Sequence, residues 1–322
     1  MEVSTADNII RDRLIQLNNA FSQLNITEHS PEVIRMFDEL VTFCFSNEIS
    51  SSILNYMLER DTDLAAACEN LCRLFAFHGF SVELKSARIC AADKNQNLND
   101  YFKHRHSYEE LIQFEMNILQ EFGVHLAKSP TINNESDILV TKVAFIGSGP
   151  IPTSSMIILS NHGPFVDIYN IDMCEEANQL ASIISEQVLP PHLSKRMHFI
   201  TQDISQNPLC ESVKSILNQC QLIYLAAYVG MNELEKLEIL RNLVNQSNDE
   251  LTPKTKQYFV IRTAEGLYQV LFPKIKAEKI SMLQATTNDN NQEINKKFLF
   301  QVKSAHLTLK EYGMVTIIAE SI

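Results

Sequence analysis

The chain has 322 residues, 45% of them hydrophobic and 20% charged, which is an ordinary composition for a globular protein with a substantial core. Its net charge of −12 without a dense basic stripe excludes nucleic acid as an expected partner, but it is compatible with small zwitterionic or cationic ligands. No apolar run reaches about 18 residues and the polar N-terminus lacks a signal-peptide core, so we expect a cytoplasmic protein that does not enter a membrane.

The seven cysteines are scattered along the chain, which is typical of reduced thiols and not of a disulfide framework. Cys68 and Cys72 share one helix face, an arrangement that could serve a metal. No histidine or cysteine pair complements them at the spacing of a zinc site, so we expect both thiols to pack in the core. The sequence therefore predicts a protein that requires no metal.

Two domains are predicted, because the pattern of apolar residues changes along the chain. Residues 1–127 show helical spacing almost throughout, whereas strands and helices alternate in residues 139–322. The segment 128–138 between them is polar and contains a proline, so we expect it to be a linker.

The first domain is predicted to be entirely helical. Ser30 is expected to cap its second helix, because Pro31 and the acidic Glu32 follow it. The predicted helices cover Ile9–Leu24, Val33–Phe45, Ile49–Leu58, Asp63–Phe77 and a segment that starts at Ser107 and buries Leu111, Phe114, Ile118 and Leu119.

A glycine turn, Gly147-Ser148-Gly149, follows an apolar strand predicted at Leu139–Ile146. A helix through Met156–Leu159 comes next, and we expect a hydroxyl of Thr153–Ser155 to cap it. Both glycines can adopt positive φ and leave their backbone N–H groups open to a ligand across the strand end. Such a turn is weak evidence by itself, since it also occurs where nothing binds.

Acidic residues lie at the ends of the next two predicted strands, Val166–Asp172 and Arg196–Ile204. In a doubly wound sheet, Asp172 would accept hydrogen bonds from ribose hydroxyls and Asp203 from an adenine amino group, although each could instead cap a helix. The glycine turn lacks the third glycine of a dinucleotide fingerprint and the Gly-Lys-Ser/Thr of a phosphate loop. With a fourth strand at Gln221–Met231, this order predicts an adenosyl ligand without phosphates.

The remaining pattern predicts elements that complete a seven-stranded sheet. We expect helices at Leu209–Leu217 and Glu233–Val244, a strand at Gln257–Thr263, and two strands, Lys279–Ala285 and Lys297–Val302, around the loop Thr287–Glu293. A further strand, Met314–Ala319, has no assigned place. We therefore predict an α/β fold in which a Rossmann-like, seven-stranded sheet of the methyltransferase type follows an all-helical N-terminal domain.

Several segments resemble the nicotianamine synthase family. Phe145–Pro152 is similar to the family's Phe-Ile-Gly-Ser-Gly-Pro-Leu-Pro segment. The resemblance continues through Tyr169–Asp172, Ala177-Asn178, Phe199–Ile204, Leu225–Met231, Ile261–Gly266 and Leu271–Pro273, and upstream it includes Ser30–Val33 and Tyr108-x-x-Leu111-x-x-x-Glu115. It covers roughly residues 30–303, and the joint order of the segments is more specific than any one of them.

This resemblance implies the substrate and the reaction. Family members bind S-adenosylmethionine, transfer its 3-amino-3-carboxypropyl (aminobutyrate) arm to an amine, and release methylthioadenosine. The chain is thus expected to be a nicotianamine synthase or nicotianamine-like synthase that makes a metal-chelating metallophore. Two alternatives stay open: a single transfer to histidine or another amino acid for an opine-type metallophore, and a non-catalytic adenosyl-binding protein.

The resemblance also implies roles for individual residues. Glu115, which the helix pattern alone would leave as a solvated carboxylate, is the expected general base, and Tyr108 on nearly the same helix face would hold the substrate or the base. Arg262 could pair with an amino-acid carboxylate or form a structural ion pair, and Glu265 is expected to contact the substrate. The expected donor-binding residues are Gly147, Ser148, Gly149, Asp172, Met173, Asp203, Ile204, Ala226 and Tyr228.

The chain departs from the plant members at three places. Asn170-Ile171-Asp172 replaces Asp-Ile-Asp and keeps the second acid, and Thr263–Tyr268 replaces Ser-Ala-His-Gly-Ala-Arg without its histidine and arginine. Tyr228 lies where leucine is usual. These differences fall where the acceptor is expected, so they concern the acceptor more than the donor.

Overall fold

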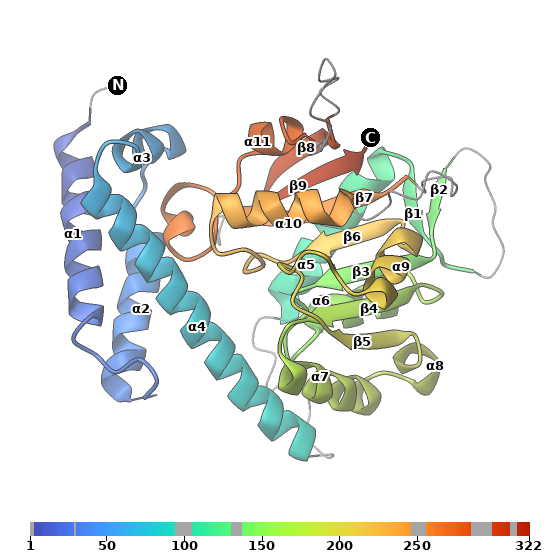
Figure 1. Ribbon diagram of the computed structural model, residues 1–322. Helices are drawn as coiled ribbons and strands as arrows, with labels where there is room; N and C mark the ends of the chain where they lie inside the picture. Colours follow the sequence, from blue (N-terminus) through green and yellow to red (C-terminus); the bar gives the residue numbers. More distant parts are fainter. Residues whose placement is uncertain are drawn as a thin grey trace.

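The computed structural model describes residues 3–28, 30–93, 105–129, 137–245, 256–284, 298–309 and 314–322. A group of N-terminal helices lies beside a larger α/β part, and one long helix, α4, reaches from the first to the second (Figure 1). Within these ranges no helix is both long and apolar enough to cross a membrane.

Helices α1 (Thr5–Phe21), α2 (Pro31–Ser46), α3 (Ser51–Leu58) and the first half of α4 (Thr62–Ala92) form the N-terminal helical part. Each begins after a residue whose side chain accepts a hydrogen bond from a backbone N–H of the first turn, namely Ser4, Ser30, Ser50 and Asp61. The cap predicted at Ser30 is thereby confirmed. The apolar sides of these helices meet in one cluster that includes Leu14, Leu17, Phe37, Leu40 and Leu71.

Helix α4 extends beyond its predicted end at Phe77 and continues to Ala92. Its second half packs on helix α7 (Glu175–Val188) through a small apolar cluster that contains Ala87 and Ile184. The Arg88 guanidinium adds a bidentate ion pair to the Glu176 carboxylate, with N–O distances of 2.6 and 2.8 Å. One helix thus carries side chains of the N-terminal part onto the α/β part.

The central sheet has seven strands in the order β5-β4-β3-β6-β7-β9-β8. The strands are β3 (Lys142–Ile146), β4 (Asp167–Asp172), β5 (Met197–Thr201), β6 (Leu222–Leu225), β7 (Tyr258–Ala264), β8 (Phe300–Leu309) and β9 (Met314–Ser321). Strand β9 is antiparallel to both of its neighbours, whereas the other pairs are parallel. This order confirms the predicted Rossmann-like sheet behind a helical N-terminal part.

Helices cover both faces of the sheet. Alternate residues of a strand point to opposite faces, so each strand contributes side chains to the core on both sides. On one face, Val143 and Phe145 pack against α5 (Arg105–Glu121) and α6 (Thr153–Ile157). On the other face, Ala144 and Ile146 pack against α9 (Glu211–Gln219) and α10 (Glu233–Asn245). The remaining short elements are the π-helical turn η2 (Ile158–His162), α8 (Pro191–Ser194), the 3₁₀ turn η3 (Gly266–Val270) and α11 (Ala277–Ser281).

One of the strands predicted near the end of the chain was wrong. Lys279–Ala285 was expected to be a strand, but α11 occupies its start and Gln284 forms an isolated bridge with Phe298. The predicted loop Thr287–Glu293 lies outside the described residues. Ile280 and Leu283 are buried three residues apart, a spacing that suits a helical turn. Strands β8 and β9 pair in antiparallel fashion, and β9, the strand without an assigned place, lies between β7 and β8.

The prediction also failed around the proposed linker. Helical spacing was expected up to Ala127, but Val124–Leu126 forms strand β1, which pairs in parallel with β2 (Ile138–Val140). The strand predicted at Leu139–Ile146 is therefore two strands with a break at Thr141. Helix α5 and strand β1 share a core cluster with the sheet. The domain boundary at residues 128–138 stays a prediction.

Candidate functional site

A cavity of about 470 Å³ lies where the carboxyl ends of β3, β6 and β7 meet the helical part. Its walls come from α2, α4, α5, the glycine turn, α6 and the segments that follow β6 and η3. Residues that line it include Val41, Phe45, Phe75, Glu83, Tyr108, Gly147, Ser148, Gly149, Ser154, Ala226, Tyr228, Arg262 and Phe272. The structure thus brings together segments that are more than 200 residues apart in the chain.

The glycine turn has the geometry that only glycine adopts readily. Gly147 and Gly149 have φ of 76° and 69°, and a Cβ at Gly147 would lie 2.3 Å from Val229 Cγ2. Their N–H groups are not open to a ligand as predicted, because Gly147 N donates to Ile171 O (2.8 Å) and Gly149 N to Asp172 Oδ2 (2.9 Å). The turn therefore lines the cavity while its two glycine N–H groups hold it to β4.

The Asp172 carboxylate lies at the end of β4 and organises the turn. Besides the bond from Gly149, its Oδ1 accepts a hydrogen bond from Cys174 N at 3.0 Å. Each oxygen keeps acceptor capacity for a further donor, since a carboxylate has about four lone-pair sites. Asp172 itself is not among the residues that line the cavity, so its ribose contact stays a prediction.

Three further predicted donor-binding residues, Asp203, Ile204 and Met173, differ in their contacts and exposure. Asp203 Oδ1 accepts hydrogen bonds from the N–H (2.9 Å) and the hydroxyl (2.7 Å) of Ser205, which forms an Asx turn and not a helix cap, because the next helix, α9, begins at Glu211 after Cys210. Ile204 is buried, whereas 71% of Met173 is exposed. None of these three lines the cavity, so their donor-binding roles stay predictions.

Helix α6 presents three hydroxyls at its start, but none of them caps the helix as predicted. Pro152 occupies the N-cap position and makes no side-chain cap. Ser154 Oγ instead accepts a hydrogen bond from Arg262 Nη1 (3.0 Å), and Ser155 Oγ donates to Asn170 Oδ1 (2.6 Å). In the described part of the chain, the buried Ser148 hydroxyl has no partner, which leaves it available to a molecule in the cavity.

Glu115, the predicted base, is fully buried and does not line the cavity. Both of its oxygens accept hydrogen bonds from Arg262, from Nε and from Nη2 at 2.9 Å each, and Oε1 also accepts from Thr316 Oγ1 at 3.2 Å. Arg262 therefore forms the structural ion pair that the sequence left open as an alternative. Glu115 lies about 10 Å further along α5 than Tyr108, because two helical turns separate them.

Arg262 is buried beside two aromatic rings as well as paired. Its guanidinium carbon lies 5.6 Å from the ring centroids of both Phe145 and Tyr224. The two rings stack on each other with their centroids 5.1 Å apart. This packing holds the guanidinium at the cavity wall, where it presents little uncompensated charge because Glu115 neutralises it.

Glu83, on the second half of α4, is the cavity carboxylate that the sequence interpretation missed. It faces the glycine turn, since a Cβ placed on Gly149 would lie 3.4 Å from Glu83 Oε1. Burial, and secondarily the Asp172 carboxylate, raise the pKa of Glu83 to about 7. A carboxyl group with this pKa can take up and release a proton near neutral pH. No sequence signal distinguished it, because the helix was expected to end before it.

Tyr108 and Tyr228 line the cavity close to Glu83. Although 40% of Tyr108 remains accessible, desolvation and then the Glu83 charge raise the pKa of its phenol. The Tyr228 ring packs on Phe272 with the ring centroids 5.4 Å apart. Ala226 also lines the cavity as predicted, whereas Glu265 is exposed and does not line it, so its substrate role stays a prediction.

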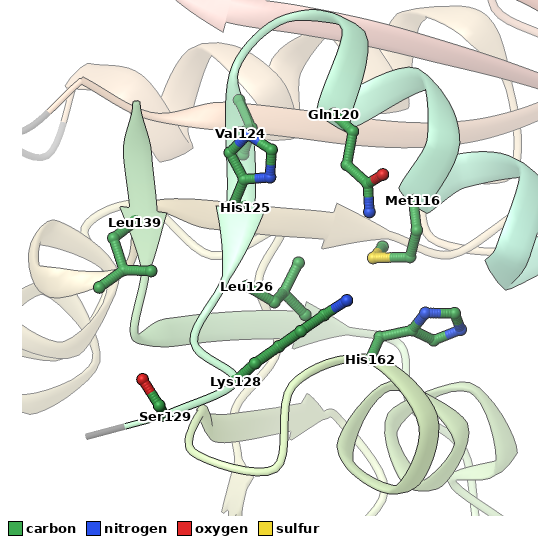
Figure 2. Close-up of a pocket in the computed structure, with 9 residues that line it drawn as sticks. All are labelled: Met116, Gln120, Val124, His125, Leu126, Lys128, Ser129, Leu139 and His162. Atoms are coloured by element: carbon green, nitrogen blue, oxygen red, sulfur yellow. The ribbon is translucent and has the colours of Figure 1, made fainter. Parts of the chain in front are cut away.

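A second, smaller hollow of about 210 Å³ lies at the other end of α5, between β1, β2 and the end of η2 (Figure 2). Its polar side chains are Gln120, His125, Lys128, Ser129 and His162, and all of them are at least partly exposed. It contains none of the predicted site residues, so we place the candidate site in the larger cavity.

Metal-ligating side chains do not gather in the described ranges into any group of three or more that could hold an ion. Cys68 and Cys72 pack in the helical part, where burial raises the pKa of each thiol to about 12. Core packing is thus confirmed for this pair. Independence of the protein from metals stays a prediction.

Comparison with protein families gives a match over nearly the whole chain. Residues 3–306 match the family described as "Nicotianamine synthase protein". The chain is 26% identical to nicotianamine synthase 1 of Arabidopsis thaliana over 284 residues, which cover 87% of this chain and 79% of that protein. It is 28% identical to nicotianamine synthase 3 of Oryza sativa subsp. indica over 270 residues, with 84% and 70% covered.

Solved structures with the same fold include those of MtNAS. A mutant of MtNAS in complex with S-adenosylmethionine superposes with a TM-score of 0.65 at 12% identity, covering 97% of this chain and 98% of that one. MtNAS in complex with MTA and tNA gives a TM-score of 0.63 at 15% identity, covering 98% and 96%. At these identities the likeness concerns the fold alone.

Proposed function

The chain belongs to the nicotianamine synthase family, and from that premise we propose that it transfers the 3-amino-3-carboxypropyl group of S-adenosylmethionine to an amine and releases methylthioadenosine. The observation that carries the proposal is the cavity in which a glycine turn, a carboxylate of raised pKa and a wall of N-terminal helices meet. We further propose that repeated transfer and closure of an azetidine ring yield nicotianamine or a similar metallophore.

The donor is proposed to lie across the glycine turn. Gly147, Ser148, Gly149, Ala226 and Tyr228 line the cavity there. The ends of β3 and β6 flank this place, which is where ligands of open α/β sheets usually bind. The presence of S-adenosylmethionine in an MtNAS complex with the same fold supports this donor.

Glu83 is proposed as the general base in place of Glu115. The acceptor amine must lose a proton before it can attack, because an ammonium group has no lone pair. Its lone pair then forms an N–Cγ bond while the Cγ–S bond breaks, and the bonding electrons stay on sulfur as the thioether of methylthioadenosine. Glu83 is the carboxylate that lines the cavity, whereas both oxygens of Glu115 are held by Arg262.

The helical part explains why Cγ and not the methyl carbon would be attacked. A sulfonium offers three carbons, so the place of the acceptor decides which bond breaks. Most proteins with this sheet transfer methyl groups, but here α2, α4 and α5 wall the cavity opposite the glycine turn. Such a wall can enclose the amino-acid arm of the donor and a second amino acid next to Cγ.

The nucleoside product tests this proposal directly. We expect methylthioadenosine when the protein is incubated with S-adenosylmethionine, measured by chromatography. S-adenosylhomocysteine as the product would refute the reaction class. Mass spectrometry of the other product, with the donor alone and then with histidine added, separates repeated transfer from a single transfer to histidine. Absence of any product together with tight donor binding would indicate a non-catalytic adenosyl-binding protein.

Asp172→Ala is expected to weaken binding of S-adenosylmethionine by about 1.5–3 kcal/mol, as for the loss of hydrogen bonds to a charged acceptor. The variant also removes the acceptor of the Gly149 N–H, which acts in the same direction. Calorimetry measures the affinity. Asp167→Ala is the matched control, because Asp167 lies at the other end of β4 and pairs with Arg196. Unchanged affinity in Asp172→Ala would rule out the ribose assignment.

A further inference from the structure

Lys236, in the first part of α10, is a fully buried lysine that lies outside the cavity. Its Nζ donates hydrogen bonds to the backbone oxygens of Ala227 (2.6 Å) and Val229 (2.7 Å). These two residues flank Tyr228, whose side chain lines the cavity. One side chain therefore holds the segment on both sides of a cavity tyrosine.

The chain passes very closely over the Lys236 side chain. Gly230 has φ of 75°, and a Cβ placed on it would lie 2.8 Å from both the backbone N and Cγ of Lys236. Glu235, the preceding residue, accepts hydrogen bonds from Met231 N and the Asn232 side chain at 2.7 Å each. The start of α10 thus contacts the segment after β6 at several successive residues.

Burying a lysine for packing alone is unfavourable, because its charge must leave water. In the described part of the chain, no carboxylate pairs with Lys236, and its hydrogen bonds go to the two carbonyls. Burial lowers the pKa of Lys236 to about 7, although the Cys72 thiol and the Glu235 carboxylate act in the opposite direction. The neutral amine has two N–H donors and the ammonium three, so either form can serve both carbonyls.

The segment that Lys236 holds carries a residue that departs from the plant members of the family. Tyr228 packs on Phe272. Burial raises the pKa of its phenol, and Cys72, Tyr108 and Glu83 act in the same direction. A shift of the segment would therefore move the aromatic wall that faces the proposed base.

We propose that Lys236 is a positioning residue, which fixes the backbone on both sides of Tyr228 and so sets the cavity wall next to Glu83. The expected effect of Lys236 on turnover rests on the proposed function, whereas its expected effect on the mobility of the backbone around Tyr228 does not. Replacing Lys236 with an apolar side chain leaves the carbonyls of Ala227 and Val229 without this donor, so the segment becomes more mobile.

The test compares Lys236→Met with Lys214→Met, which removes a surface lysine paired with Glu211 on α9. In Lys236→Met, amide hydrogen exchange in a peptide spanning residues 226–232 should accelerate at least about tenfold, with exchange in α7 unchanged. The control should exchange as the wild type does. Unchanged exchange in Lys236→Met overturns the proposal. If this variant does not fold, Lys236→Gln takes its place with the same criterion, because its side chain is one atom shorter and its amide does not reach both carbonyls.

Kinetics then test whether Lys236 acts through Tyr228. In Lys236→Met, the KM for S-adenosylmethionine should rise about tenfold while kcat changes less than about threefold. Tyr228→Leu should raise this KM by a similar factor. The double variant should have a KM no higher than that of the more affected single variant, because both substitutions disturb the same cavity wall. If the increases in KM caused by the two substitutions multiply in the double variant, the positioning role is overturned. An unchanged KM in Lys236→Met overturns it as well. A wild type without turnover refutes the proposed function, and hydrogen exchange alone then decides the role of Lys236.

Discussion

Glu83→Gln is expected to lose turnover by about 10²–10⁴-fold, the usual contribution of a positioned general base, while it binds S-adenosylmethionine with nearly unchanged affinity. Glutamine keeps the size of the side chain but cannot accept the amine proton. Single-turnover assays with the donor at saturation measure the loss, and calorimetry measures the affinity. Glu69→Gln on the same helix is the matched control, because Glu69 pairs with Arg73 on the surface.

The pH dependence of kcat/KM follows from the raised pKa of Glu83. Below about pH 7 the carboxyl is protonated and cannot accept a proton, so wild-type kcat/KM should rise as pH increases through this value. The difference between wild type and Glu83→Gln should shrink at high pH, where more of the acceptor amine is already neutral. A variant with full activity at every pH would show that another group is the base.

Thermal unfolding of the same variant checks that a loss of turnover is not a loss of fold. A carboxyl group whose pKa is higher in the folded than in the unfolded state stabilises the fold while it is protonated. That stabilisation is lost as pH rises from the unfolded pKa of 4.5 through the folded pKa of about 7. Glu83→Gln should therefore unfold at a higher temperature than wild type above pH 7, and the difference should vanish near pH 4.

Arg262→Met is expected to lower the free energy of unfolding by about 3–5 kcal/mol, because it leaves the buried Glu115 carboxylate without its counter-charge. The Thr316 hydroxyl still donates to Glu115, but one neutral hydrogen bond cannot replace a bidentate cation. Denaturant unfolding monitored by circular dichroism measures the change, with the slope of the transition checked for two-state behaviour.

Two further variants show whether the burial of the Glu115–Arg262 pair causes the loss of stability in Arg262→Met. Arg88→Met breaks an exposed bidentate pair with Glu176 and should cost at most about 1 kcal/mol. The double variant Glu115→Leu/Arg262→Met removes both charges and should recover much of the stability lost in Arg262→Met, since no uncompensated charge remains. Equal losses in Arg88→Met and Arg262→Met would contradict the assignment of Glu115 and Arg262 as a structural pair.

The amino-acid sequence by itself determined the fold class and the family. The strands predicted at Leu139–Ile146, Val166–Asp172 and Gln221–Met231 all contribute to one sheet, and the turns that end them are local features of the sequence. The positive φ of Gly147 follows equally from residue type. These features could be predicted because hydrogen bonding and burial along one strand or helix repeat with a fixed period that the sequence itself displays.

The tertiary structure decided the place of β9 and the end of α4. Met314–Ala319 is buried on both faces, so its pattern lacks the alternation that would show which strands it pairs with. Helix α4 continues past Phe77 because α7, more than 80 residues later in the chain, provides a partner for its second half. Pairings of this kind depend on contacts between distant segments, which a local pattern does not contain.

The tertiary structure also decided which carboxylate faces the ligand. Glu115 and Glu83 are both helical glutamates, and the sequence favoured the first through its motif. In the structure, Glu115 lies one turn of α5 beyond Leu111, which lines the cavity, and both of its oxygens are held behind the cavity wall by Arg262. The continuation of α4 instead brings Glu83 over the glycine turn. A side chain's role follows from the direction in which it points and the charges it meets, and both are set by how helices pack on the sheet.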